Sequence, residues 1–321
     1  MSDQPLVFAI PSKGRIEEGT RAFFTRAGLV TQKEAGARNY TGRFAGIPHA
    51  EVLFLSAGEI PAALEEGTAH LGITGEDLMR ERAQDAARSI MLILPLGFSK
   101  ADVVVAVPSA WIDVASMADL DEVAHDFRAR HRRHLRVATK YFKLTRSFFA
   151  EHGLIDYRIV ESAGATEGAP ASGLAEIIVD ITTTGATLAA NSLKVLPDGV
   201  ILRSQAQLAA SRKAVWSARA KAAARQVLDL IWAAQQAQRA SLRFAFKGEA
   251  ATLEKALKTL SADAALWPAG GGELSLYFDE RKAYEVVTLL RKHGVEGPLA
   301  TARPGQYFTP HNPLIDAVFK G

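Results

Sequence analysis

The sequence predicts an α/β protein with largely parallel sheets, followed by a smaller α+β domain at its C-terminal end. Two observations support this. Short apolar strands alternate with helical segments up to about residue 205, and after a long helix the order changes to strand, helix, strand, strand, helix, strand. A chain of 321 residues is long enough for two or three domains with ample cores. We therefore expect a two-lobed core and a separate small domain.

The composition is that of a soluble globular protein, with 48% hydrophobic and 23% charged residues. The net charge of +3 is too small to favour nucleic acid. The absence of cysteine excludes disulfides, thiolate metal sites and cysteine nucleophiles. The N-terminal segment lacks the features of a signal peptide, and the longest apolar run, residues 90–96, is too short to span a bilayer. We expect a cytoplasmic protein with no nucleic-acid or membrane partner.

The first lobe is predicted from residues 1–107 together with 190–240. Lys13, Gly14 and Arg15 follow its first strand and precede a helix at 16–27, and such strand-to-helix loops lie on the ligand side of open α/β sheets. Two cations beside a glycine suit a phosphate, although a solvated loop is the alternative. The other expected elements are strands at 52–55, 70–73, 90–94, 103–107, 195–197 and 200–204, and helices at 59–67, 74–82 and 213–240.

A second candidate loop in this lobe follows the strand at 70–73. Gly75 and Asp77 lie where that strand turns into a helix, which makes them candidate ligand-binding residues. Asp77 also has the spacing of a capping box with Thr74, with Asp in place of Glu. Both alternatives remain open at this point.

The second lobe is predicted from residues 108–189. A helix at 118–130 ends in a basic cluster at 131–134, which suits either a solvated helix end, favoured by the helix dipole, or a subunit contact. A strand at 135–139 is followed by a helix that Lys140 and Tyr141 begin. Another strand is expected at 157–161, and a loop or short helix at 164–173.

The stretch at residues 173–188 predicts an anion site. Ile177, Ile178, Val179 and Ile181 favour a buried strand, and a threonine- and glycine-rich turn follows it. Backbone N–H groups at such a turn and at a helix start bind anions, and Gly185 lets the backbone approach closely. A helix is expected to continue from residue 188 to 193. The alternative is an ordinary strand-to-helix turn with a threonine N-cap.

The donors of this turn and the acid before it suit different parts of a ligand. The residues expected to hold a phosphate are Thr183, Thr184, Gly185, Ala186 and Thr187. Asp180 would repel phosphate at contact but is well placed to accept hydrogen bonds from sugar hydroxyls. No lysine follows the glycine, so the stretch is not a P-loop. The combination suits a ribose 5-phosphate.

The last part of the chain predicts a βαββαβ domain at residues 241–321. Its expected strands are at 241–246, 274–278 and 298–301, with helix faces at 253–260 and 283–290 and a hairpin turn at 270–272. This is the ferredoxin-like order. Such a domain after an enzyme core suggests regulation or oligomerisation by analogy. Residues 304–321 are expected to form a tail.

Motifs for other chemistry are missing. The eight histidines form no zinc motif, and no Gly-x-Ser-x-Gly nucleophile elbow is present. The pattern favours chemistry done by positioning substrates, with Mg²⁺ held mainly by substrate phosphates and no protein metal site.

The sequence resembles the ATP phosphoribosyltransferase family, which begins histidine biosynthesis. The main motif is carried by Glu167, Gly173, Ala175, Ile178, Asp180, Thr184, Gly185, Thr187 and Leu188. Shorter matches are Lys13-Gly14-Arg15, the segment 71–75 with Asp77, the segment 137–141 with Thr145-Arg146, and Ala169-Pro170. The resemblance covers about residues 5 to 240. In the last domain, Leu266-Trp267-Pro268 stands where the family has a Thr- or Ser-containing segment near its histidine site.

The resemblance implies that N1 of ATP attacks the anomeric carbon of phosphoribosyl pyrophosphate, giving phosphoribosyl-ATP and pyrophosphate with Mg²⁺. It implies catalytic roles for Glu167 and Asp180, with Asp180 and residues 183–187 binding phosphoribosyl pyrophosphate. It implies ATP or pyrophosphate contacts for Lys13, Gly14, Arg15, Gly75, Asp77 and Lys140. The implied fold is a periplasmic-binding-protein-like core with an ACT-like domain. The implied assembly is a homo-oligomer that forms hexamers and is active as dimers. L-histidine is the implied inhibitor.

Two alternatives are compatible with parts of this pattern. Another phosphoribosyltransferase would usually carry two adjacent acids before the phosphate loop, whereas Val179 precedes Asp180 here. A non-catalytic binding protein or regulatory subunit on the same fold is the second alternative. The intact set of Glu167, Asp180 and Thr187 argues against it.

Overall fold

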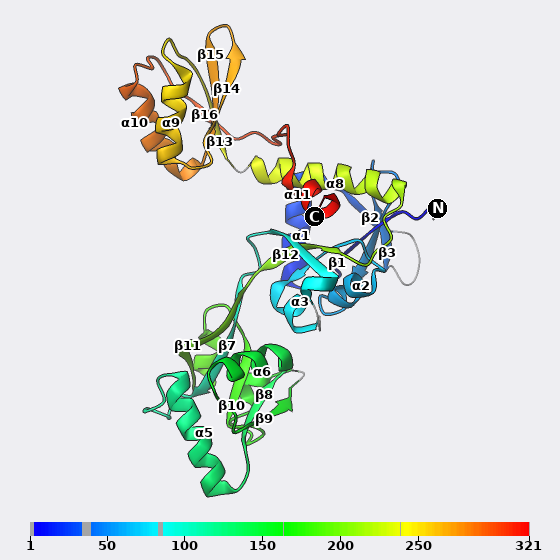
Figure 1. The fold of residues 1–321 in the computed structure, drawn as a ribbon, viewed down its shortest axis with the longest axis vertical. Helices are drawn as coiled ribbons and strands as arrows, with labels where there is room; N and C mark the ends of the chain where they lie inside the picture. The colour runs from blue at the N-terminus through cyan, green and yellow to red at the C-terminus, as the bar shows by residue number, and fades with distance from the viewer. Residues whose placement is uncertain (1–2, 34–39, 83–85, 163, 238, 321) are drawn as a thin grey trace. The chain divides into compact units, whose positions relative to one another are not determined.

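The computed structural model describes residues 3–33, 40–82, 86–162, 164–237 and 239–320. These residues form sheets of seven, five and four strands (Figure 1). The chain divides into two compact units, the first comprising residues 1–21, 32–43 and 49–221 and the second residues 22–31, 44–48 and 222–321. The first unit contains most of the seven-stranded sheet and all of the five-stranded sheet. No helix in the described part of the chain is long and apolar enough to cross a membrane.

The seven-stranded sheet of the first lobe has the order β2-β3-β4-β1-β5-β12-β6. Its central strand β1 is parallel to β4 and β5, whereas β12 is antiparallel to β5 and β6. Ile60 and Leu64 of α2 are fully buried in its core. The elements are β1 (Leu6–Pro11), α1 (Arg15–Ala27), β2 (Thr31–Lys33), β3 (Thr41–Phe44), β4 (Ala50–Leu55), α2 (Ile60–Glu66), β5 (Leu71–Gly75), α3 (Glu76–Arg82), α4 (Ala86–Ser89), β6 (Ile90–Pro95) and β12 (Ala206–Ser211).

The five-stranded sheet of the second lobe has the order β11-β7-β10-β8-β9. Its central strand β10 is antiparallel to β7 and parallel to β8. α5 begins with a capping box between Ser116 and Asp119. The elements are β7 (Ala101–Pro108), α5 (Met117–His131), β8 (Leu135–Thr139), α6 (Phe142–Glu151), β9 (Tyr157–Glu161), the 3₁₀ turn η1 (Thr166–Gly168), β10 (Ile177–Thr182), α7 (Ala186–Ala190) and β11 (Leu193–Ser204).

The strand pairing moves the boundary between the lobes away from the predicted residues 107 and 190. β7 and β11, assigned to the first lobe from the sequence, both pair in the second sheet. The reason is that β10 needs a partner on each side, and β7 supplies the one that β8 does not. The chain therefore crosses between the lobes at about residues 96–100 and again at residue 205. The expected helix at 188–193 is also wrong, since α7 ends at Ala190 and β11 begins at Leu193.

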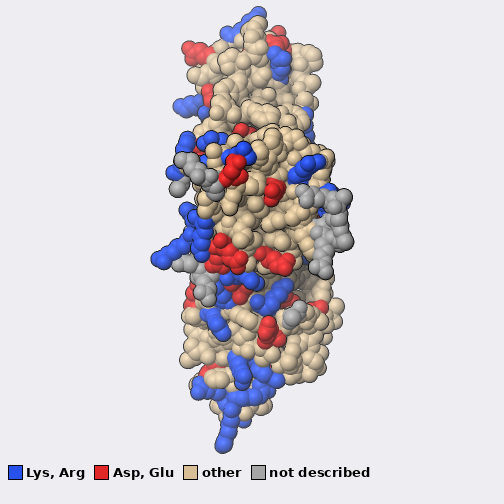
Figure 2. Space-filling view, turned by 90° about the vertical axis from the view of Figure 1, so that its right-hand side faces the viewer, with Lys and Arg blue, Asp and Glu red and all other residues tan. Residues whose placement is uncertain are grey.

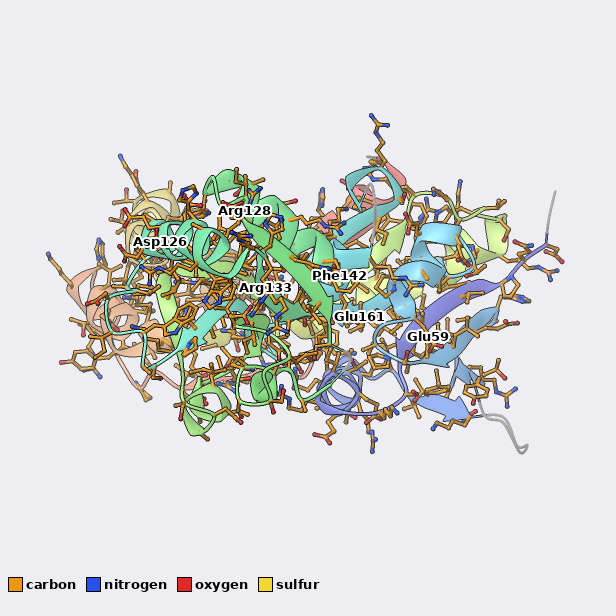
Figure 3. All side chains as sticks on the ribbon, turned by 90° about the horizontal axis from the view of Figure 1, so that it is seen from below. Glu59, Asp126, Arg128, Arg133, Phe142 and Glu161 are labelled. Carbon is orange, nitrogen blue, oxygen red and sulfur yellow. The ribbon has the colours of Figure 1, made fainter. Side chains whose placement is uncertain are left out.

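The basic cluster at 131–134 is the end of α5, where Arg132 adopts the left-handed conformation with φ 53°. Figure 2 shows Lys and Arg side chains gathered at the bottom of the view, where α5 ends. Arg128 pairs with Asp156, and Arg130 pairs with Asp126; Arg128 and Asp126 are labelled in Figure 3. Residues 131–134 themselves are exposed, as expected of a solvated helix end. The subunit contact stays a prediction.

The second unit contains a four-stranded antiparallel sheet of order β14-β15-β13-β16, with α9 and α10 covering one face. The strand and helix order is the predicted βαββαβ. Gly270, Gly271 and Gly272 all have positive φ at the turn between β14 and β15. The elements are α8 (Ala218–Gln236), which crosses the division between the units, β13 (Ala240–Ala245), α9 (Ala250–Leu260), β14 (Ala265–Gly270), β15 (Glu273–Phe278), η2 (Glu280–Lys282), α10 (Ala283–Lys292), β16 (Thr301–Ala302) and α11 (Pro313–Phe319).

Residues 304–321, expected to be a tail, include helix α11 and contact α8. The indole N–H of Trp232 donates to Thr309 at 2.8 Å, and the Asn312 amide donates to Asp229 at 2.8 Å. Tyr307 stacks on Tyr277 with ring centroids 3.9 Å apart. The segment therefore joins the small sheet to α8 within the second unit.

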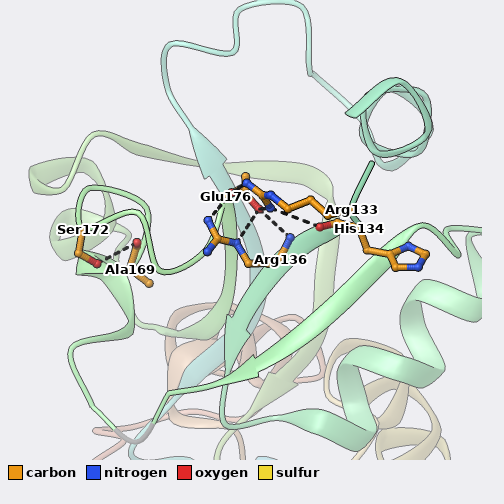
Figure 4. A network of polar contacts seen from close by, with 6 residues as sticks. All are labelled: Arg133, His134, Arg136, Ala169, Ser172 and Glu176. Carbon is orange, nitrogen blue, oxygen red and sulfur yellow. Dashed lines mark hydrogen bonds and ion pairs between the residues drawn. The ribbon is translucent and has the colours of Figure 1, made fainter. Parts of the chain in front are cut away.

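The start of β10 is tied to β8 by one carboxylate (Figure 4). Glu176 accepts hydrogen bonds from the Arg136 backbone N–H at 2.8 Å and from its guanidinium at 2.7 Å, and Arg133 donates to it at 3.0 Å. Burial by itself would raise the pKa of Glu176, but the two arginines outweigh it and lower the pKa to about 2. The hydrogen bonds between Glu176 and Arg136 hold β10 beside β8 in the parallel register in which Ile177 lies opposite Val137.

We expect Glu176→Gln to destabilise the protein by roughly 1–2 kcal/mol at pH 7, because the two guanidinium groups lose a charged acceptor. A lowered folded pKa means that this stability is present above the unfolded value of 4.5 and is lost as the pH falls toward about 2. Urea unfolding of wild type and variant over this pH range measures it. Asp126→Asn, which breaks an exposed pair in the same lobe, should change stability by at most about 0.5 kcal/mol.

Candidate functional site

The carboxyl end of β10 leads into the predicted anion loop. Ile177, Ile178 and Val179 are fully buried, which holds the strand in the core while the residues after it reach the surface. Gly185 adopts φ 75°, a conformation that favours glycine, and its N–H donates to Thr182 Oγ1 at 2.9 Å. No partner lies against the N–H groups of Thr183, Thr184 and Thr187 in the described part of the chain. These groups and the hydroxyls are available to an anion.

The helix after this loop differs from the expectation. α7 has only five residues, because Asn191 and Ser192 turn the chain into β11. So short a helix adds little dipole, since the macrodipole depends on several aligned peptide units. The anion-binding capacity of the loop therefore rests on its own N–H and hydroxyl groups.

A cavity of about 510 Å³ opens over this loop. It brings together residues far apart in the chain: Arg15 follows β1, Glu167 lies in η1, and Asp180 lies in β10. Arg15 Nη1 donates to Thr183 Oγ1 at 3.2 Å, so the first lobe contacts the threonine loop directly. The cavity is lined by Arg15, Glu167, Asp180, Ile181, Thr182, Thr183, Thr184, Ala186, Thr187 and Leu188.

Asp180 is the half-buried acid of this cavity. Burial raises its pKa above the usual aspartate range, while the Ile181 N–H at 2.8 Å and the charge of Lys140 work in the opposite direction. The nearby charge of Glu167 adds to the increase. Asp180 therefore lies within electrostatic reach of a cation, Lys140, and of a second carboxylate, Glu167.

Other predicted residues lie near the cavity or at its approach without lining it. Lys13 and Gly14 are exposed in the loop between β1 and α1, and Gly14 has φ 84°. The Gly14 carbonyl accepts the Glu18 N–H at 3.1 Å and so starts α1. Lys140 is exposed, with its ammonium 5.1 Å from the ring centroid of Tyr141.

Gly75 and Asp77 are not brought to this cavity. Asp77 is 5% exposed, and its carboxylate accepts hydrogen bonds from the Tyr141 hydroxyl and the Ser204 hydroxyl, each at 2.8 Å. The alternative of a capping box with Thr74 is wrong, because Thr74 donates to the Ala57 carbonyl at 2.8 Å and the Asp77 N–H donates to Ser204. Gly75 is needed beside Asp77, since a Cβ there would collide with the carboxylate.

Sequence reasoning did not identify the partners of Asp77. Tyr141 carried a signal, since it belongs to the segment 137–141 that resembles the family. Ser204 carried none, because it belongs to no motif and lies 127 residues from Asp77 in the sequence. Among the described residues, no group of three or more His, Asp or Glu side chains is arranged to hold a metal ion.

The groups that line the cavity suit different parts of one ligand. A loop of free N–H and hydroxyl donors suits a phosphate, and two carboxylates beside it suit the hydroxyls of a sugar and a developing positive charge. Arg15 adds a fixed cation at the edge. The cavity is therefore suited to a phosphorylated sugar whose reaction builds positive charge on its ring.

Comparison with known proteins identifies the same family that the sequence motifs resemble. Residues 56–232 match the model of the family described as HisG: ATP phosphoribosyltransferase. An ATP phosphoribosyltransferase of Bradyrhizobium sp. (strain ORS 278) is 55% identical over 91% of this chain and 91% of its own. One from Bradyrhizobium diazoefficiens is 53% identical over 97% of this chain and 96% of its own.

A solved structure, the ATP phosphoribosyl transferase (HisG:HisZ) complex from Thermotoga maritima, contains a chain with a similar fold. The TM-score is 0.55 at 23% identity, and the similarity covers 71% of this chain and 97% of that chain. The family match over more than half of the sequence and the high identity to relatives over more than nine tenths of their length establish the function as well as the fold class. The chain belongs to the ATP phosphoribosyltransferase family, whose transfer of a phosphoribosyl group to ATP serves histidine biosynthesis.

Proposed function

We propose that the cavity at the end of β10 is the phosphoribosyl site of this transferase. One observation carries the proposal: Arg15, Glu167 and the continuous stretch from Asp180 through the threonine loop are three separate segments of the chain, and they line one cavity. Thr183, Thr184, Gly185, Ala186 and Thr187 hold the 5-phosphate through N–H and hydroxyl groups. Asp180 and Glu167 accept hydrogen bonds from the ribose hydroxyls.

The reaction joins adenine N1 of ATP to the anomeric carbon as the bond from that carbon to pyrophosphate breaks. Positive charge develops on the ribose ring and negative charge on the leaving oxygen. Asp180 and Glu167 stabilise the ring, while Arg15, Lys13 and Lys140 meet the pyrophosphate and triphosphate charge. Gly14 supplies the left-handed turn that presents its two flanking cations. Fixed charges of this kind each lower the barrier by about 3 kcal/mol.

Gly75 and Asp77, which the resemblance suggested as ligand contacts, do not bind substrate in this arrangement. Both carboxylate oxygens of Asp77 already accept hydrogen bonds from protein groups. The residue is also buried and does not line the cavity.

We propose that Mg²⁺ enters with the substrate. Asp180 and Glu167 are oxygen donors of the kind that Mg²⁺ prefers, but a dedicated protein cage is missing among the described residues. When bound, Mg²⁺ supplies charge neutralisation at the leaving pyrophosphate. The phosphates of the substrate would supply most of its oxygen ligands.

We also propose that the two lobes form a periplasmic-binding-protein-like core and that the C-terminal domain is an ACT-like regulatory domain. The two crossings of the chain between the sheets support the first, and the β14-β15-β13-β16 order supports the second. The enzyme is then cytoplasmic, inhibited by L-histidine, and a hexamer whose active form is a dimer. Trp267 lies in the segment Leu266-Trp267-Pro268, where the family has a Thr- or Ser-containing segment, and is 44% exposed on this domain.

We expect Asp180→Asn to lower turnover by about 10²–10³-fold while the fold is kept, because the variant loses the negative charge that faces the developing positive ring. Product formation from ATP and phosphoribosyl pyrophosphate, with Mg²⁺ and pyrophosphatase, measures it. Asp113→Asn, at an exposed position of the same lobe, serves as the matched control and should leave turnover unchanged. Wild-type turnover in Asp180→Asn would show that the proposed phosphoribosyl site is wrong.

We expect Arg15→Ala to raise KM for phosphoribosyl pyrophosphate about tenfold, the effect of losing roughly 1.4 kcal/mol of charged contact. Arg15→Lys should recover only part of it, because an ammonium cannot keep the guanidinium geometry toward Thr183. Arg21→Ala, on the same helix, is the control. An Arg15→Ala enzyme with normal KM would place Arg15 outside substrate contact.

We expect L-histidine to lower product formation and to shift the enzyme toward a hexamer in size-exclusion chromatography with light scattering. The physical reason is that a ligand that stabilises one assembly shifts the equilibrium by its differential affinity for that assembly. Addition of L-arginine at equal concentration is the control. Turnover and assembly that ignore histidine would leave the C-terminal domain without this ligand.

A further inference from the structure

The two lobes are joined by two short crossings that lie side by side. The Leu96 N–H donates to the Ala206 carbonyl at 2.9 Å, and the Ala206 N–H donates to the Phe98 carbonyl at 3.0 Å. Two crossing strands linked in this way can act as a hinge, because only a few backbone dihedrals need to change. The angle between the lobes must then be set by other contacts. Arg15 and Thr183 supply one, but both residues are exposed.

A second set of contacts between the lobes is buried. Asp77, at the start of α3 in the first lobe, accepts hydrogen bonds from Tyr141 of the second lobe and from Ser204, the last residue of β11. The three residues are 5%, 1% and 5% exposed. Polar contacts shielded from water hold their geometry more firmly than exposed ones, because breaking them leaves unsatisfied groups.

The same helix makes a further contact one turn later. The carboxylate of Glu81 accepts the backbone N–H of Lys143 at 2.9 Å and that of Leu144 at 3.0 Å. Tyr141, the N-cap position of α6, makes no side-chain capping bond to the described residues of its own helix. The first lobe therefore supplies the cap that α6 lacks, and an acid at a helix N-terminus is favourable.

These contacts lie directly beside the proposed site. Tyr141 follows Lys140, whose ammonium lies over its ring. Burial raises the pKa of Tyr141, with the charges of Asp77 and Asp180 among the further causes, so its hydroxyl stays protonated and donates to Asp77. Any shift of Tyr141 relative to α3 would move Lys140 with it.

We propose that Asp77, Glu81, Tyr141 and Ser204 form a polar fastener that fixes the angle between the lobes, with Tyr141 and Ser204 as positioning residues for phosphoribosyl transfer. The fastener holds Lys140 and the threonine loop of the second lobe at a set distance from Arg15 of the first. Tyr141 and Ser204 act through Asp77 and do not touch substrate. This inference rests on the proposed phosphoribosyl site.

The test compares Tyr141→Phe and Ser204→Ala in the full-length enzyme by kcat, KM for phosphoribosyl pyrophosphate and thermal unfolding. We expect each variant to raise this KM about tenfold with a smaller change in kcat, and Ser204→Thr to restore much of it. The double variant should be little worse than either single one, since both remove a donor to the same carboxylate. Ser211→Ala, at an equally buried serine whose bonds stay within the first lobe, is the matched control.

A lower unfolding temperature with unchanged KM in Tyr141→Phe would reduce the network to a structural role and overturn the proposal. Tyr141→Phe removes a single oxygen, so it decides the matter if Ser204→Ala does not fold. The Asp180→Asn variant distinguishes failure of the proposed phosphoribosyl site from failure of the fastener. If Asp180→Asn keeps wild-type turnover, the proposed site is wrong; if it is inactive while both fastener variants keep normal KM, only the fastener is wrong.

Discussion

The pairing of β10 between β7 and β8 is the constraint on which the site depends. The buried isoleucine and valine side chains of β10 hold the strand in the centre of its sheet, and Glu176 with two arginines sets its register against β8. Parallel strands end at the same edge, so Lys140 after β8 and Asp180 in β10 come within electrostatic reach of each other. The charge arrangement of the cavity therefore follows from the order of strands.

A site made in this way needs both lobes. The threonine loop and the two acids belong to the second lobe, whereas Arg15 comes from the loop after β1 in the first. Transfer of a phosphoribosyl group requires opposite charges at fixed distances, since the ring becomes positive as the pyrophosphate becomes negative. Asp77 and Glu81 join the lobes beside this cavity by accepting hydrogen bonds from the second lobe. These two acids therefore contact protein groups and not the ligand.

Much of the site could be predicted because its signals are local. A buried strand, an acid and a run of threonines with one glycine are contiguous, and the structure places Asp180, Thr183, Thr184 and Thr187 in one cavity. Asp77 shows the limit of this reasoning. Its place after a strand suggested a ligand, but its partners Tyr141 and Ser204 lie 64 and 127 residues away. Hydrogen bonds over such distances leave no periodic signal in the sequence.

The sequence by itself determined the alternation of strands and helices, the βαββαβ order of the last domain, the threonine-rich turn after β10 and the family. These features depend on local hydrophobic patterns, turn residues and motif spacing. Only the tertiary structure decided that β7 and β11 belong to the second sheet, that α7 is a single short helix, and that residues 313–319 form a helix near α8. The physical reason is that strand pairing and the burial of polar groups depend on which distant segments become neighbours.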